Sequence, residues 1–236
     1  MQFSYDIHIH SALSPCSTLE MTPNNIINMA QIKKLNIISI TDHNCMDNVK
    51  PIIKLGIKKD ILVVPGIEVT SKEDVHLLCY FKDLVNGLNF SRKIYESLPN
   101  IKNNEIIFGE QVLYDEFDSI IGSLDKLLLN SSTYTIGEIN ELANYYNGIM
   151  VPAHIDRKSS GLLGVLGFIP KGLNIGSIEV SSIVQGEKIK SGLGDLNIIY
   201  NSDAHDLGSI NEPIYFMNLK ELTLKNVIGY LKGENP

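Results

Sequence analysis

Short apolar segments that predict β-strands alternate along the chain with longer segments that predict α-helices. Strands are predicted at residues 6–10, 37–40, 61–64, 75–81, 149–153, 177–181, 197–201 and 214–217. Helices are predicted at residues 22–35, 47–59, 84–98, 135–146 and 222–231, the first and fourth beginning at the capping hydroxyls of Thr22 and Thr135. Strand–helix–strand repeats at this spacing predict an α/β protein with largely parallel strands.

The alternation is interrupted between about residues 84 and 132. Within this region, residues 106–114 and 119–129 flank the turn-like run Asp115–Asp118. This pattern predicts a hairpin or an irregular insertion. The region has no linker-like composition, so we expect one domain over residues 1–236 with an insertion at about 84–132.

The first predicted strand carries two histidines that are two residues apart. In a strand such residues point to the same side, so Asp6, His8 and His10 are expected on one face, with Ile7 and Ile9 on the other. Two imidazoles roughly 6–7 Å apart along a strand can converge on one metal ion. A histidine in a strand can equally be a satisfied polar residue, so this pair alone does not establish a metal site.

The remaining histidines also lie at predicted strands. His43, His154 and His205 follow strand ends, while His76 lies near the start or middle of its strand. The acids Asp42, Glu68 and Asp203 accompany them at similar strand ends. In parallel α/β folds, ligands and catalytic groups collect at the carboxyl ends of strands. A mixed set of imidazoles and carboxylates favours zinc, manganese or iron.

Composition narrows the classes of partner. The 236 residues are 44% hydrophobic, contain no apolar run long enough for a membrane span, and start without a signal-peptide pattern, so we expect a soluble, cytoplasmic protein. Three widely spaced cysteines, Cys16, Cys45 and Cys79, argue against a disulfide framework. A net charge of −7 without a basic block makes long nucleic acid an unlikely partner, although a strand end held at a metal centre is not excluded.

Five motifs, in order along nearly the whole chain, resemble those of the polymerase and histidinol phosphatase (PHP) superfamily of metal-dependent phosphoesterases. They are Asp6-Ile7-His8-Ile9-His10-Ser11, Thr41-Asp42-His43-Asn44, Pro65-Gly66-Ile67-Glu68-Val69, Pro152-Ala153-His154 and Ser202-Asp203-Ala204-His205. The chain is most similar to the small stand-alone members. The resemblance implies a distorted (β/α)7 barrel with its site at the carboxyl ends of the strands.

The resemblance also implies two or three divalent ions and distributes their ligands. One ion would be held by His8, His10, Glu68 and Asp203, and Glu68 would bridge to a second ion held by His76 and His154. His43 and His205 would hold the third. Asp6 and Asp42 are candidates for orienting these histidines, and Asp42 could equally serve at the strand end.

The third site departs from the family pattern. Many relatives have an acid five residues after the second histidine, where this chain has Pro15, and others have a histidine at the next position, where it has Cys16. A thiolate is a good zinc ligand, so Cys16 could complete the site. Alternatively, Cys16 is a loop residue and the third site is weak.

These ions imply hydrolysis of phosphate esters by a metal-activated water, with His8, His10, Glu68, His154, Asp203 and His205 acting through the metals. Arg157 could grip a substrate phosphate through its planar guanidinium, or could simply be a solvated surface residue. The sequence has no Gly-x-Ser-x-Gly elbow and no phosphate-binding Gly-rich loop.

Three functions therefore remain open. The first is hydrolysis of a small phosphomonoester or short nucleotide, the second is exonuclease-like action on nucleic-acid ends, and the third is a non-catalytic metal-bound sensing or scaffold module. The insertion is rich in acids, which favours a small substrate if it lies over the site. It could equally thicken the barrel wall or form a dimer contact, and the oligomeric state is not predicted.

Overall fold

The computed structural model describes residues 1–234. Along the chain its elements are β1 (Gln2–Ile9), α1 (Pro23–Ile32), β2 (Ile37–Ile40), α2 (Val49–Lys58), β3 (Leu62–Thr70), β4 (His76–Phe81), α3 (Leu84–Ser97), α4 (Glu105–Phe108), β5 (Val112–Tyr114), β6 (Ile120–Ser123), α5 (Ile136–Tyr145), β7 (Gly148–Pro152), α6 (Leu162–Leu166), β8 (Ser177–Glu179), α7 (Ile183–Ile189), a 3₁₀ turn (Lys190–Gly192), β9 (Asn197–Ile199), β10 (Phe216–Asn218) and α8 (Leu224–Leu231).

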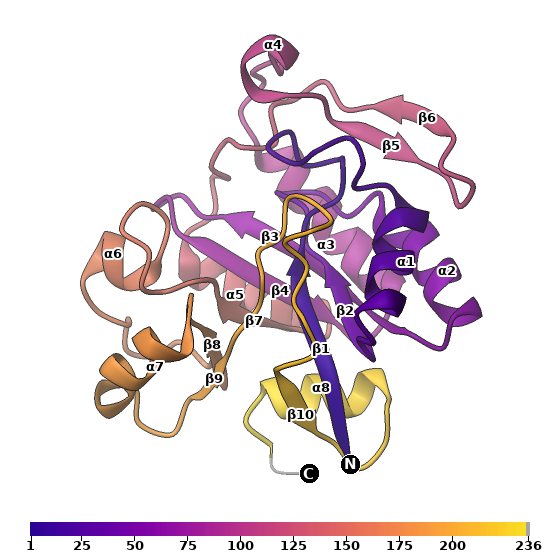
Figure 1. The fold of residues 1–236 in the computed structure, drawn as a ribbon. Coiled ribbons are helices and arrows are strands. Elements are labelled where there is room, and N and C mark those ends of the chain that lie inside the picture. The colour runs from indigo at the N-terminus through magenta and orange to yellow at the C-terminus, as the bar shows by residue number, and fades with distance from the viewer. Residues whose placement is uncertain (235–236) are drawn as a thin grey trace.

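The strands curl into a distorted barrel with helices around it (Figure 1). One sheet has the order β10-β1-β2-β3-β4-β7, and β8 pairs with β9 in parallel. The Ile155 N–H donates to the Glu179 carbonyl beside β7, and Ala204, just after β9, bridges to Ile9 of β1. Strands β1, β2, β3, β4, β7, β8 and β9 thus follow one another around the wall, which confirms the predicted α/β barrel.

The expected parallel arrangement fails at β4, which is antiparallel to both β3 and β7. Only a short turn joins β3 to β4, and the Ser71 hydroxyl accepts hydrogen bonds from the Glu73 and Val75 N–H groups within it. A parallel pair needs a crossover of a dozen or more residues, so this turn can only form a hairpin. β10 is also antiparallel, along the outer edge of β1.

Two apolar clusters hold the barrel together. An inner cluster lies between the strands, where Leu78 and Tyr80 of β4 meet Val64 of β3, and Val227 of α8 closes it. An outer cluster joins the strands to α1, α2, α3 and α5. Successive residues of β4 belong alternately to the two clusters, because neighbouring side chains in a strand point to opposite faces.

The two isoleucines of β1 do not share one cluster as predicted. Ile7 packs in the inner cluster and Ile9 in the outer one. The pairing of β1 with β2 shifts register between Asp6 and Ile9, which turns the end of the strand. His8 and His10 nevertheless reach the same site, where their Nε2 atoms lie 3.2 Å apart.

Helix α3 packs against β3 and β4 like the other barrel helices, so the irregular region begins after it. We call residues 99–134 the inserted segment. It contains the hairpin β5–β6, with strands shorter than predicted. The start of the predicted first strand is instead the helix α4, whose first turn is capped by the Asn104 side chain and which ends at Gly109 with a φ of 95°.

The inserted segment lies at the end of the barrel where β1 finishes, beside the loop that follows β1 (Figure 1). Val112 N–H donates to the Ala12 carbonyl, and the buried Asn48 side chain bonds both Val112 O and Tyr114 N. At the tip of the hairpin, Asp118 accepts from the Thr22 hydroxyl. The segment is therefore fixed to the barrel at several points.

Among the described residues, no helix combines the length and the apolar character that crossing a bilayer requires.

Candidate metal centre

Eight side chains meet at the end of the barrel above the inner apolar cluster. They are His8, His10, His43, Glu68, His76, His154, Asp203 and His205. Most of them lie at or just beyond the carboxyl end of a strand. His76 is the first residue of β4, and because β4 runs opposite to its neighbours, its start reaches the same end.

Glu68 is the centre of the cluster. Its side chain is buried, and five imidazole nitrogens approach its two oxygens. The nitrogen–oxygen distances are 2.9 Å for His76 Nδ1, 3.0 Å for His43 Nδ1, 3.2 Å for His154 Nε2, and 3.4 Å for each Nε2 of His8 and His10. One carboxylate can therefore contact two ions, one beside each oxygen.

Asp203 supplies the second carboxylate. Its Oδ1 atom lies 3.1 Å from Nε2 of His8 and 3.1 Å from Nε2 of His10. Its Oδ2 atom accepts a hydrogen bond of 2.5 Å from the guanidinium of Arg157. Asp203 has a φ of 53° and His154 a φ of 25°, a left-handed backbone that non-glycine residues rarely adopt. Such backbone geometry is concentrated at functional sites.

Two histidines of the cluster use their Nδ1 atoms for hydrogen bonds within the protein. His8 Nδ1 lies 3.0 Å from both oxygens of Glu179, and His205 Nδ1 is 2.8 Å from the Asp203 carbonyl. An ionised carboxylate and a carbonyl can only accept hydrogen bonds, so each Nδ1 carries a proton. The Nε2 lone pair of each neutral ring is then free for a cation.

His10 is oriented through Ser14. The Ser14 hydroxyl donates to Asp42 over 2.7 Å, so it can only accept from His10 Nδ1, 2.9 Å away. The same hydroxyl accepts from the N–H of His43. Asp42 therefore acts on His10 indirectly. Asp6, the other predicted orienting residue, instead accepts from the Ser202 and Asn211 N–H groups, which fixes the loop after β9.

Burial lowers the pKa values of the clustered histidines, whereas the nearby carboxylates raise them. Burial disfavours the charged form of His10, but contacts with Asp203 and Glu68 outweigh it and raise its pKa to about 9. The pKa of His8 is raised by Glu179, Asp203 and Glu68 in spite of burial. Burial lowers the pKa of both His43 and His205 to about 4. Burial opposes ionisation of Glu68, yet the surrounding histidines hold its pKa well below the usual value.

The donor set fits divalent metal ions. Three groups of ligand atoms lie within 4.8 Å of one another, namely His8–His10–Glu68–Asp203, His43–Glu68–His76 and His10–His43–His205. Within residues 1–234, Glu68 Oε2, Asp203 Oδ1 and His43 Nδ1 are buried and lack a hydrogen-bond partner. Buried polar atoms are rarely left unpaired, and shared cations would satisfy all three.

Three predicted site residues lie outside these groups. Cys16 is exposed and belongs to none of them, although desolvation and the nearby charge of Glu68 raise the pKa of its thiol to about 12. Arg157 reaches the site, where it pairs with Asp203 and remains 44% exposed. His154 also lies outside the three groups, but its Nε2 contacts Glu68.

Glu179 is a site residue that the sequence reasoning missed. It is buried at the end of β8, and besides His8 it accepts from the His154 N–H over 2.8 Å and from Asn201 over 2.7 Å. The signal was present, since Glu179 stands between Ile178 and Val180 in a predicted strand, where one acid must face the opposite side.

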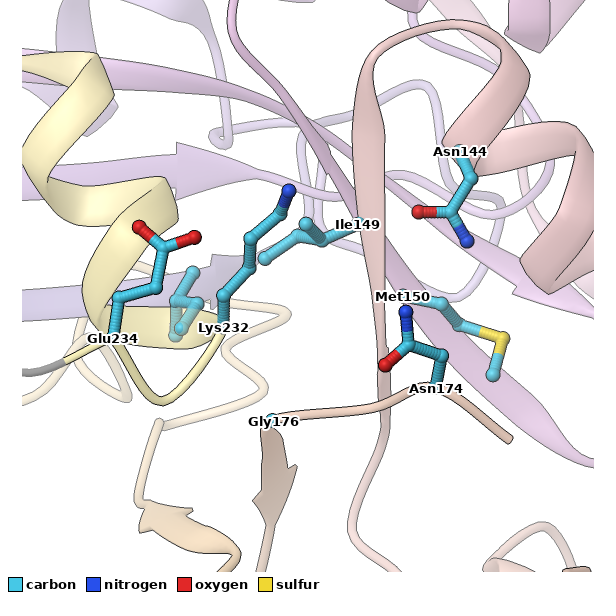
Figure 2. Close-up of a pocket in the computed structure, with 8 residues that line it drawn as sticks. Asn144, Ile149, Met150, Asn174, Gly176, Lys232 and Glu234 are labelled. Atoms are coloured by element: carbon cyan, nitrogen blue, oxygen red, sulfur yellow. The ribbon is translucent and has the colours of Figure 1, made fainter. Parts of the chain in front are cut away.

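A separate cavity of about 250 Å³ lies at the other end of the barrel (Figure 2). Asn144, Lys232 and Glu234 are among its lining residues, and Lys232 extends between Glu234 and Ile149 in the close-up. The cavity has no cluster of metal-binding side chains among the described residues. We therefore assign the candidate site to the Glu68 end.

The chain is similar in structure to three solved proteins. The lesion-specific endonuclease from Pyrococcus furiosus has a TM-score of 0.74 and 20% identity, with 100% of this chain and 57% of the endonuclease covered. A two-domain protein from Bacteroides vulgatus that contains a predicted PHP-like metal-dependent phosphoesterase has a TM-score of 0.61 and 17% identity, over 99% and 63% of the two chains. An amidohydrolase from Chromobacterium violaceum, solved with bound sulfate and no metal, has a TM-score of 0.59 and 15% identity, over 93% of each chain.

At these identities, the three structures establish a shared fold. The chain spans less than two thirds of the first two proteins. A comparison with curated proteins gave no match. In sequence, residues 6–177 match the PHP domain, a range that includes His8, Glu68 and His154. The chain therefore belongs to the PHP domain family, the family that its motifs predicted.

Proposed function

We propose that the chain hydrolyses a small phosphomonoester or a short nucleotide at two or three divalent ions, zinc, manganese or iron, held by the cluster around Glu68. The observation that carries this proposal is the buried Glu68 carboxylate, which contacts five imidazoles at 3.4 Å or less. A structural role would not require so many titratable groups in one buried place.

In this proposal, His8, His10, Glu68 and Asp203 hold one ion, which agrees with the ligand group that the distances define. Glu68 would also contribute to a second ion with His76 and His154, and His43 and His205 would hold the third. His43 is also within ligand distance of Glu68 and His76, and His10 of His43 and His205, so neighbouring sites share side chains. Cys16 remains the candidate for an additional ligand of the third site.

Bound divalent ions would make hydroxide available near neutral pH and offset the charge of the phosphate. The chain's own residues position the reaction. Ser14 and Glu179 fix the imidazole rings of His10 and His8. Arg157 is half-exposed beside Asp203, and its remaining N–H groups would donate to a phosphate oxygen.

A small substrate is favoured by charge around the site. Glu105 and Glu110 of the inserted segment border a groove beside the loop that follows β1. Acids at this position repel a polyanion. A second candidate function is cleavage of nucleic acid, since the similar endonuclease was also solved with a 27-mer duplex that carries an abasic lesion at its active site.

The metal content of the purified protein tests the proposal first. Elemental analysis should find at least two transition-metal ions per chain, because two carboxylates and six imidazoles are available. Glu68→Gln should lose most of the metal and the phosphatase activity together. Glu141→Gln, which alters an exposed acid on α5, is the matched control.

A phosphate-release screen then separates the two candidate functions. Small monoesters should be hydrolysed, and an abasic duplex or single-stranded oligonucleotide should be a poorer substrate. Preferential cleavage of the duplex would replace the first candidate with the second. A protein that takes up less than one ion per chain would contradict both.

A further inference from the structure

A groove with a volume of about 400 Å³ lies between the loop that follows β1 and the inserted segment. Ser17, Thr18 and Leu19 form one wall, and Glu105, Ile106 and Glu110 form the other. None of the eight side chains of the candidate metal centre lines this groove.

Backbone contacts connect the groove directly to two candidate ligands. The Thr18 N–H donates to the carbonyl of His205 over 2.9 Å. The Ser17 hydroxyl lies 3.3 Å from the same carbonyl and 3.4 Å from the carbonyl of His10. The groove therefore adjoins the backbone of two candidate metal ligands.

The two walls are held against each other. Gly109 packs so closely against the loop that a Cβ atom built on it would lie 2.0 Å from the Pro15 carbonyl oxygen. The Asn103 amide donates to the Gly109 carbonyl over 2.8 Å, which fixes the end of α4. The groove is thus a formed feature, and a ligand need not order the inserted segment before it binds.

The chemistry of the walls selects a ligand class. Ile106 is 98% exposed and Leu19 is 45% exposed, so both present free apolar surface. Glu105 and Glu110 add negative charge, and the groove has no basic side chain among its described lining residues. An apolar group would gain contact with the two aliphatic side chains, whereas an anionic group would be repelled.

We propose that this groove is the leaving-group subsite, and that it selects an apolar alcohol without negative charge. This inference rests on the proposed phosphoesterase function and narrows its substrate class. A phosphate ester of such an alcohol would place the apolar group on Ile106 and Leu19. Oligonucleotides and sugar bisphosphates, whose leaving groups carry further phosphates, would be disfavoured.

The test compares two substrates that differ by one charge, phenyl phosphate and para-carboxyphenyl phosphate, with the metal-loaded full chain. The carboxylate makes the phenol a better leaving group, so intrinsic reactivity alone would favour the carboxylated ester. The subsite predicts the opposite order in kcat/KM, mainly through KM. Glu110→Lys should shift the ratio toward the carboxylated ester roughly threefold to fivefold, as expected for an exposed charge pair.

Ile106→Asp should lower kcat/KM for phenyl phosphate by about fivefold, because it removes an apolar contact and adds a charge. Ile106 is almost fully exposed, so the substitution does not disturb the packing, and metal content and Tm verify this. Ile57→Asp on α2 and Glu141→Lys on α5 are matched exposed controls that should leave the ratio unchanged.

The outcomes distinguish the two proposals. If the wild-type chain hydrolyses both esters and neither Glu110→Lys nor Ile106→Asp alters their ratio, the subsite is wrong and the phosphoesterase function stands. If the metal-loaded chain hydrolyses neither these esters nor other monoesters, the proposed function fails and takes the subsite with it.

Discussion

Glu179 shows how much of this site depends on a residue that contacts no ion in our proposal. All the groups that its carboxylate contacts are hydrogen-bond donors, namely His8 Nδ1, the His154 N–H and the Asn201 amide. The His154 contact also supports a backbone with a positive φ. Glu179 therefore positions two of the proposed metal ligands, His8 and His154, which come from different strands.

Glu179→Gln should weaken metal binding while the fold is kept. Glutamine is nearly the same size, but its amide NH₂ would face donors where the carboxylate accepts. We expect a loss of metal affinity of about 10-fold to 100-fold, the range for orienting partners of metal-bound histidines. Competition with a chromophoric chelator measures this affinity, and Glu141→Gln is the control. Equal affinities in the two variants would contradict the positioning role.

At the same scale, the sequence predicted which side chains meet at the site better than how each of them is oriented. Histidines and acids at strand ends could be identified because parallel strands bring their carboxyl ends together. The chain of hydrogen bonds from Asp42 through Ser14 to His10 could not be predicted, because it depends on where a loop places one hydroxyl group. Cys16 illustrates the same limit, because the sequence gives its chemistry and the loop determines its distance from the imidazoles.

Among the elements, β4 carries the main topological correction. Only five residues, 71–75, join β3 to β4, and this is too few for a parallel crossover. A hairpin could therefore have been predicted from spacing alone. The reversal has a functional result, since it delivers His76 from the start of a strand to the site that other strands reach at their ends.

The inserted segment was predicted as a hairpin, and its turn at residues 115–118 is present between β5 and β6. Its attachment to the barrel could not be predicted, because the contacts that fix it join residues far apart in sequence. Asn48 is the clearest case. Its buried side chain donates to Val112 O and Ser11 Oγ and accepts from Tyr114 N.

Asn48→Ala should release this attachment. The change leaves the Val112 carbonyl and the Tyr114 N–H without a partner in a buried place, which costs about 1–3 kcal/mol for each unsatisfied group. We expect a lower free energy of unfolding in denaturant titrations and faster proteolysis within residues 99–134. Asn25→Ala, which removes an exposed hydrogen bond to Glu20, should change stability little. Similar stabilities of the two variants would refute the role of Asn48.

At the scale of the whole molecule, the barrel holds the charged side chains around Glu68 directly above the inner apolar cluster. The inner cluster below Glu68 contains large apolar side chains such as Tyr80 and Ile7, and the Tyr80 hydroxyl bonds the Ile7 carbonyl. The alternation of strands and helices predicted this architecture. The pKa values of the site depend on the assembled fold, because each shift arises from side chains that distant strands bring together.

These shifts predict how pH affects the stability of the metal-free chain. The folded-state pKa of His10 is about 9, above the ordinary value of 6.5, and that of His8 is also raised. Their contribution to the free energy of unfolding is therefore complete below pH 6.5 and is lost as pH rises through about 9. His43 and His205 have folded-state pKa values of about 4, so their contribution is present above pH 6.5 and is lost as pH falls through about 4.

Chelator-treated protein should consequently be most stable near pH 6.5 and lose stability toward both limits. Denaturant unfolding at pH values between about 4 and about 9 measures this change in stability. His10→Asn should reduce the alkaline loss of stability, because one of the two groups that lose a proton there is gone, and should leave the acid side in place. Metal binding replaces the proton on His10, so the loaded protein should lack the alkaline loss and should release protons on metal uptake at neutral pH. A metal-free chain that is equally stable at pH 6.5 and at about pH 9 would show that His8 and His10 are not charged in the folded state.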